Sequence, residues 1–188
     1  MMLEEFLAAY QTAFHELPQT VIWSNDRVIR TSAMQSYIYP RIAHALGLYL
    51  VCELPTDAAY FDRAGIDQAA ANQAAYPNPH NAMLCIEHEN NCVGAQHEIE
   101  QLRDSQAALN VLITYLHANI DQQIGWANDH FREILQGVTE NRVFLVIFPG
   151  EAQDGMNAIL AENHYEEINM WRFFMWNNHE NTFAQVAP

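Results

Sequence analysis

Two carboxylates stand at the end of an apolar run in the middle of the sequence. The run Met83–Ile86 leads directly into Glu87, His88 and Glu89. An apolar run of this length, bounded by turn-forming residues, is typical of a buried strand, in which residues two apart project from the same face. Glu87 and Glu89 are therefore expected to project together, with His88 on the opposite face.

The chemistry that such a pair favours is the binding of a divalent cation. Neighbouring carboxylates repel each other and are costly to remove from water, so a site that holds two of them needs compensation. Mg²⁺ and Mn²⁺ supply it, because these ions prefer hard oxygen ligands. The same residues also fit a strand that simply emerges into solvent at Glu87. The sequence therefore leaves two interpretations open, a metal site and a solvated strand end.

The charge of the chain limits the classes of function. The formal net charge is −15 over 188 residues, and the eight basic residues are all arginines. Such a charge opposes general contact with nucleic acid or with an anionic membrane, but it is compatible with a local site that reaches phosphates through metal ions. We therefore expect no membrane partner, nucleic acid only at such a local site, and a basic protein as an alternative partner.

The cysteines and the N-terminal residues predict a cytoplasmic protein. Cys52, Cys85 and Cys92 are odd in number and form no CxxC pair, which argues against a zinc or disulfide framework. The first residues lack a basic leader, and no apolar run approaches membrane-spanning length. The sequence also lacks the glycine-rich phosphate loops, the GxSxG elbow of hydrolases and the HExxH zinc motif.

Hydrophobic periodicity predicts the elements that would position the carboxylates. Helices are expected over 3–17, 31–46, 93–105 and 120–138. Strands are expected over 48–54, 60–70, 83–89, 110–116, 143–148 and 168–176. The segment 151–167 is ambiguous.

This order of elements predicts a single α/β domain over 1–188, with a mixed central sheet flanked by helices. The strand that carries Glu87 should pair with the strand around Asp67 on one side and with 110–116 on the other. The helix between Glu87 and 110–116 is long enough for a parallel crossover. The aromatic run Trp171–Trp176 is typical of a core strand or of a contact in a homodimer.

The middle of the chain resembles a known group of proteins. A helix, three successive strands, a helix and a further strand form the core of the restriction-endonuclease-like, or PD-(D/E)XK, superfamily. The resemblance covers roughly Thr31 to Leu116 and rests on the stretch IEHENN, followed by a helix and by LNVLITYL. The family carries an aspartate in its second strand and an acidic–any–lysine triplet at the end of its third. Asp67 takes the place of the aspartate, and Glu87-His88-Glu89 takes the place of the triplet.

The resemblance implies three parts: an N-terminal helix and connector at 1–30, a nuclease-like core at 31–150 and a C-terminal strand extension at 151–188. It also implies a nuclease that hydrolyses phosphodiester bonds with Mg²⁺ or Mn²⁺. Asp67 and Glu87 would be the metal ligands, and Glu89 would orient or deprotonate the attacking water or hold a second metal. Glu53 is a further carboxylate that would lie nearby and could join the metal ligands.

One departure from the family pattern opens an alternative. The lysine of the family triplet is Glu89 here, and the chain contains no lysine that could replace it. Some enzymes of the superfamily use glutamate at that place, whereas inactive members also lose the lysine. The alternative is therefore a catalytically inactive member of the same fold, whose acidic surface mimics nucleic acid or binds a basic protein.

Overall fold

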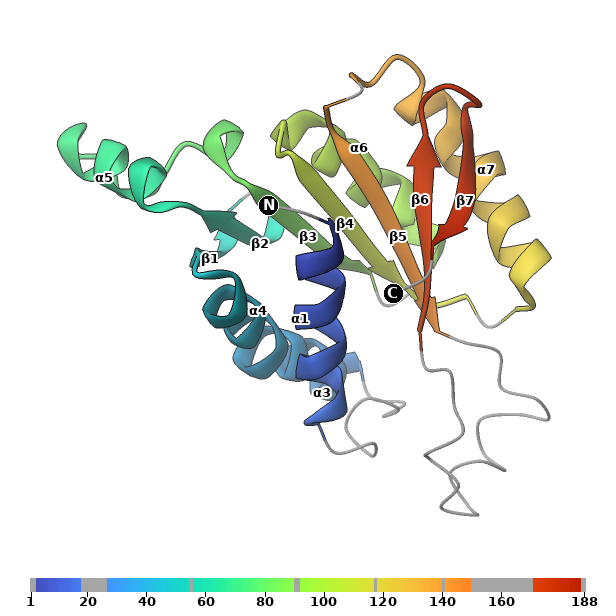
Figure 1. Ribbon diagram of the computed structural model, residues 1–188, viewed down its shortest axis with the longest axis horizontal. Coiled ribbons are helices and arrows are strands. Elements are labelled where there is room, and N and C mark those ends of the chain that lie inside the picture. The colour runs from blue at the N-terminus through green and yellow to red at the C-terminus, as the bar shows by residue number, and fades with distance from the viewer. Residues whose placement is uncertain are drawn as a thin grey trace.

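In the described part of the chain, the strands form one mixed sheet of seven, and helices cover both of its faces (Figure 1). The computed structural model describes residues 3–17, 27–54, 56–89, 92–116, 118–139, 141–149 and 171–186. The strands follow one another in the sheet in chain order, from β1 at one edge to β7 at the other. The predicted α/β class with a mixed central sheet is confirmed.

The centre of the sheet is parallel and its two sides are antiparallel. Strands β3, β4 and β5 run parallel to one another, whereas β1, β2 and β3 form one antiparallel series and β5, β6 and β7 form another. The strands are β1 (Tyr49–Leu54), β2 (Thr56–Phe61), β3 (Leu84–Glu89), β4 (Leu109–Thr114), β5 (Val143–Pro149), β6 (Trp171–Asn177) and β7 (Thr182–Val186).

Four of the described helical elements precede β1, and the others lie between β2 and β5. They are α1 (Leu3–His15), α3 (Arg27–Ala33), η1 (Met34–Ile38), α4 (Tyr39–Leu46), α5 (Arg63–Ala71), η2 (Pro79–Asn81), η3 (Cys92–Gly94), α6 (Ala95–Ser105) and α7 (Ile120–Leu135). No helix in this described part of the chain combines the length and the apolar character needed to cross a membrane.

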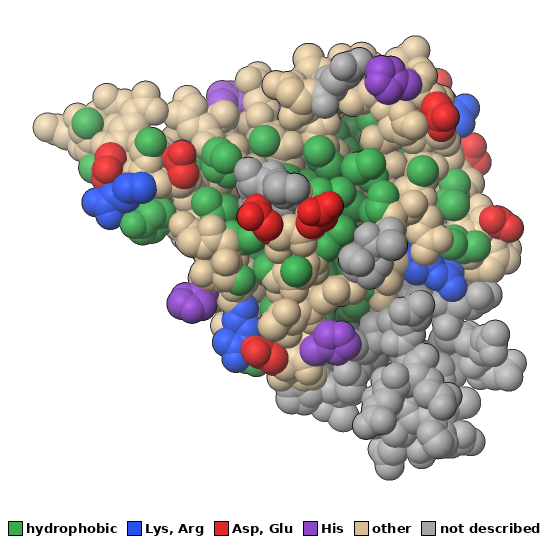
Figure 2. All heavy atoms as spheres, in the orientation of Figure 1, with side chains coloured by type: hydrophobic (Ala, Val, Ile, Leu, Met, Phe, Trp, Pro, Cys, Tyr) green, Lys and Arg blue, Asp and Glu red, His purple; other side chains and the backbone are tan. Residues whose placement is uncertain are grey.

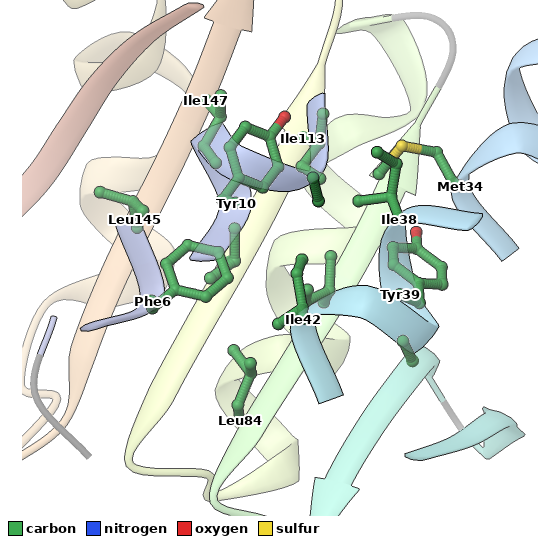
Figure 3. Packing of buried hydrophobic residues seen from close by; sticks show 14 of the residues in the cluster. Phe6, Tyr10, Met34, Ile38, Tyr39, Ile42, Leu84, Ile113, Leu145 and Ile147 are labelled. Carbon is green, nitrogen blue, oxygen red and sulfur yellow. The ribbon is translucent and has the colours of Figure 1, made fainter. Parts of the chain in front are cut away.

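One face of the sheet is packed by α1, η1 and α4 (Figure 3). Phe6 and Tyr10 lie one turn apart on α1, so both side chains point to the same side and are fully buried. They pack in one cluster with Ile42 of α4 and with Ile113 and Ile147 of the sheet. Burial of each large apolar side chain contributes roughly 1.5–3 kcal/mol to the stability of the fold. This layer therefore holds α1 and α4 against one face of the parallel strands.

The opposite face is packed by α6 and α7. Ile99 and Leu102 of α6 and Phe131 of α7 share a second cluster with Leu112 of β4 and Phe144 of β5. These two helices are the crossovers that join β3 to β4 and β4 to β5, as parallel neighbours require. Both helices therefore begin near the carboxyl ends of the parallel strands.

The predicted strand over 60–70 is wrong, because most of that stretch is helical. Strand β2 ends at Phe61, and α5 begins at Arg63. Asp62 has extended backbone angles, and its side chain accepts a hydrogen bond from the Gly65 backbone N–H at 2.8 Å, which is the geometry of a helix cap. The alanines that follow favour helix. Asp67 therefore lies on a helix that projects beyond the sheet (Figure 1).

The remaining strand predictions have mixed outcomes. β4 lies beside β3 as predicted, but the other neighbour of β3 is β2, which precedes the stretch around Asp67. The described C-terminal residues contain two strands where one was predicted. The chain reverses direction between 177 and 182, so β7 pairs with β6. The ambiguous segment 151–167 lies outside the described residues.

Candidate functional site

Carboxylates from β2 and β3 lie on the face of the sheet that α6 covers. Cys85 belongs to the cluster on that face and Ile86 to the opposite one. Glu87 and Glu89 therefore project towards α6 and His88 projects away, as the alternation predicts. The antiparallel register pairs Ala58 with Ile86, which brings Asp57 next to Glu87.

Two hydrogen bonds join Asp57 to the end of β3. The Asp57 backbone N–H donates to Glu87 Oε2 at 3.2 Å, and the His88 backbone N–H donates to Asp57 Oδ2 at 2.8 Å. The backbone of one strand therefore holds the side chain of the other, and both carboxylates are fixed in place.

Glu87 is a buried carboxyl group with incomplete hydrogen bonding. The residue is 3% exposed, and its Oε1 atom has no hydrogen-bond partner among the residues that the structure describes. Burial, followed by the negative charges of Asp57 and Glu98, raises the pKa of Glu87 to about 9. Without a compensating cation, Glu87 is therefore protonated at neutral pH.

Glu98 brings a further carboxyl group from α6. Burial raises its pKa and His97 opposes the rise, while the charges of Glu89 and Asp57 raise the pKa further and a side-chain hydrogen bond with Glu87 lowers it. Because Asp57 and Glu98 act on the Glu87 carboxyl group, and Glu89 and Asp57 act on the Glu98 carboxyl group, these residues form one electrostatic cluster. The cluster consists of Asp57, Glu87, Glu89 and Glu98.

Glu89 lies against the start of α6. A Cβ atom added to Gly94, the residue before the helix, would meet Glu89 Oε2 at only 2.8 Å. Gly94 is the N-cap of α6 and makes no side-chain cap hydrogen bond. The helix dipole favours a carboxylate at this end of the helix. Gly94 thus provides the space that Glu89 occupies.

The contact predicts different results for two glycine-to-alanine substitutions. Gly125→Ala, within α7, adds a methyl group with nothing within 4 Å and should stabilise the protein by roughly 0.5–1 kcal/mol. Gly94→Ala should show no such gain, because the Glu89 carboxylate must move away. Urea unfolding of both variants measures the difference. Equal gains would mean that Glu89 does not occupy this position.

Asp67 and Glu53 have different positions from those predicted. Asp67 is outside the site, because its side chain is 58% exposed and forms an ion pair with Arg63, four residues earlier on α5, at 2.9 Å. Its predicted role as a metal ligand is therefore not retained. Glu53 lies on β1 at the position across from Asp57 in the register of β1 and β2. The Glu53 side chain lies outside the described part of the structure.

His88 has a packed, hydrogen-bonded role on the other face of the sheet. Its Nε2 atom lies 3.1 Å from Tyr115 Oη, and the guanidinium of Arg30 lies 4.7 Å from the centre of the Tyr115 ring. Burial, with a contribution from Arg30, lowers the pKa of His88 to about 3. The imidazole is therefore neutral at physiological pH and takes no part in the carboxylate cluster.

The carboxyl oxygens of this cluster are hard donors of the kind that could hold Mg²⁺ or Mn²⁺. Across the described residues, no group of three or more histidine, cysteine, aspartate or glutamate side chains converges on one point as metal ligands. Mg²⁺ is usually bound by one or two carboxylates and keeps several of its waters. Asp57 and Glu87 could supply two such carboxylates, and Glu87 Oε1 has no hydrogen-bond partner among the described residues.

Sequence reasoning missed Asp57 and Glu98. A signal for Asp57 was available in the D-x-x-G pattern at Asp62. This pattern marks a helix cap, so the second strand must end before Asp62 and include residues closer to the N-terminus.

Comparisons of the chain with protein-family models, with curated proteins and with solved structures found no match. The geometry of this site is therefore the basis for assigning a function.

Proposed function

We propose that Asp57 and Glu87 bind a divalent cation, Mg²⁺ or Mn²⁺, and that the protein is a cation-dependent nuclease that hydrolyses phosphodiester bonds. The observation that carries the proposal is the position of the two carboxylates. They stand side by side on adjacent strands, held by backbone N–H groups, and the buried Glu87 Oε1 atom has no partner in the described chain. A buried carboxylate is costly unless a positive charge compensates it, and a bound cation would supply that charge.

The order of the elements supports the class of enzyme. Helix α4, strands β1, β2 and β3, helix α6 and strand β4 follow the order of the restriction-endonuclease-like core, with α5 and η2 inserted between β2 and β3. In this arrangement Asp57 of β2 takes the place of the family's aspartate, instead of Asp67. Glu87-His88-Glu89 keeps its place at the end of the third strand.

The roles of the residues follow from their contacts. A bound Mg²⁺ or Mn²⁺ would offset charge on the phosphate and lower the pKa of a bound water. Asp57 and Glu87 would hold it, each kept in place by a backbone N–H group. Glu89 would accept a proton from the attacking water or orient it, since its carboxylate lies on the same face at the end of β3. The negative charge of Glu98 acts on Glu87, which favours a cation there.

Positive charge at the same end of the sheet favours a phosphate ligand. Phe148 pairs with Arg172 in the β5–β6 register, and Phe148 packs on the face that carries the carboxylates. Arg172 Nη1 donates to Ala118 O at 3.3 Å and to Gln123 Oε1 at 3.2 Å, which fixes the guanidinium near the start of α7. On the face drawn in Figure 2, the basic side chains of the described residues are scattered. Contact with nucleic acid should therefore be local.

Cleavage assays test the proposal. Purified protein with Mn²⁺ should cleave single-stranded DNA, duplex DNA or RNA, and Asp57→Asn and Glu87→Gln should each lower the rate by at least about 100-fold. Asp67→Asn is the matched control, because Asp67 is exposed on α5, and it should cleave like the wild type. Cleavage that requires Asp67 but not Asp57 would contradict this assignment.

The second candidate is a non-catalytic member of the same fold that binds a basic protein. The observation that favours it is Glu89, which stands where the family has its lysine and lies against the start of α6. The net charge of −15 would then provide the attraction. Mn²⁺ binding without cleavage of any of the three nucleic acids would favour this candidate over the nuclease.

A further inference from the structure

Thr114, the last residue of β4, has a buried hydroxyl group for which the described residues provide no hydrogen-bond partner. The residue is 0% exposed, and its Oγ1 atom has no hydrogen-bond partner in the ranges that the structure describes. A buried hydroxyl without a partner is costly, so it usually indicates a water molecule or an ion that completes its hydrogen bonding.

The register of the sheet places this hydroxyl beside the carboxylates. Thr114 pairs directly with Glu89 across the parallel β3–β4 ladder. It lies two residues after Leu112, which packs against α6, so its side chain projects from the same face as Glu87 and Glu89. Thr114 is therefore the direct neighbour of Glu89 and the diagonal neighbour of Glu87.

Two polar atoms without a described partner thus lie on adjacent strands, on the same face and at the same end of the sheet. Glu87 Oε1 is an acceptor when ionised, and Thr114 Oγ1 is both a donor and an acceptor. A hydrated cation satisfies both, because the ion binds the carboxylate and its water ligands donate hydrogen bonds. Mg²⁺ and Mn²⁺ keep several waters, and each of those waters needs an acceptor.

We propose that Thr114 is a positioning residue of the cation site, whose hydroxyl accepts a hydrogen bond from a water molecule bound to the ion. The inference rests on the proposed cation site at Asp57 and Glu87, and it adds a residue from a third strand. Groups that hold the ligands of a metal in this way typically change its affinity by about 10–100-fold when they are removed. Thr114 would orient the water on the Glu89 side of the site.

Mn²⁺ binding to Thr114 variants tests the inference without reference to catalysis. Free Mn²⁺ is measured by electron paramagnetic resonance during titration of the wild type, Thr114→Val, Thr114→Ser and Thr114→Ala. Valine has nearly the shape of threonine but lacks the hydroxyl, and we expect its Kd for Mn²⁺ to rise by about tenfold or more. Alanine should weaken binding in the same way, whereas serine should keep the affinity of the wild type.

Two controls separate this inference from the cation site itself. Thr12→Val removes a hydroxyl from the exposed side of α1 and should not change Mn²⁺ affinity. Asp57→Asn should abolish binding. If Asp57→Asn abolishes binding while Thr114→Val and Thr114→Ala bind Mn²⁺ like the wild type, the role of Thr114 is overturned and the cation site stands. If the wild type binds no Mn²⁺, both are overturned.

Discussion

Glu87→Gln should make the cation-free protein more stable than the wild type, by a margin that grows as the pH rises from about 5 to about 9. The pKa of Glu87 is raised to about 9 in the folded protein, whereas an unfolded chain has a glutamate pKa of about 4.3. Between these values the folded protein holds a proton that the unfolded chain has released. Glutamine keeps the uncharged form at every pH and retains an oxygen that accepts the Asp57 N–H bond.

The wild type loses stability as the pH rises because folding raises the pKa of Glu87. The Glu87 contribution is fully present below the pKa of the unfolded state and is lost as the pH rises through the folded-state pKa. The loss amounts to at most about 1.4 kcal/mol per pH unit. The free energies of unfolding of Glu87→Gln and the wild type should therefore be similar near pH 4 and several kcal/mol apart near pH 8.

Urea unfolding in the presence of EDTA, from pH 4 to pH 9, measures this margin. Glu133→Gln is the matched control, since Glu133 is exposed on α7 and lies outside the cluster. Its margin over the wild type should stay small across the range. A Glu87→Gln margin that does not change with pH would show that Glu87 is ionised in the folded protein and is not buried as described.

Mn²⁺ should stabilise the wild type by about 2.7 kcal/mol at a concentration of one hundred times its Kd. The reason is that the ion binds the folded protein only, because the unfolded chain does not hold Asp57 and Glu87 together. Asp57→Asn removes one ligand and one negative charge, so most of this stabilisation should disappear. Urea unfolding with and without Mn²⁺ measures the effect.

Asp67→Asn controls for the general effect of lost negative charge. It should keep the Mn²⁺ response of the wild type, because Asp67 pairs with Arg63 on the exposed side of α5. An equal loss of response in Asp57→Asn and Asp67→Asn would mean that Mn²⁺ acts by nonspecific screening of the acidic surface. The cation site would then be wrong.

The strands that sequence predicted well are those with continuous apolar runs. Leu84–Ile86 and Val111–Ile113 are buried on both faces, so their composition alone identifies them. The alternation of Glu87, His88 and Glu89 followed from the period of a strand and is found in the structure. These local rules were sufficient for the centre of the sheet.

The ligand pair could not be predicted in the same way, because its residues are brought together by tertiary contacts. β2 is short and contains two alanines, so its sequence carries a weak strand signal. The boundary between β2 and α5 depends on the Asp62 cap. Because this cap starts α5, β2 ends at Phe61 and Asp67 lies on the helix. Glu98 faces the cluster because of the way α6 packs, and its position next to Ile99 in the sequence does not reveal this.

A crystal of the wild-type protein soaked in Mn²⁺ tests the central claim most directly, because the anomalous scattering of the ion locates it without any assumption about activity. We expect one anomalous peak that contacts carboxylate oxygens of both Asp57 and Glu87, on the face of the sheet covered by α6. A peak at Asp67, or the absence of a peak between Asp57 and Glu87 at saturating Mn²⁺, would contradict it.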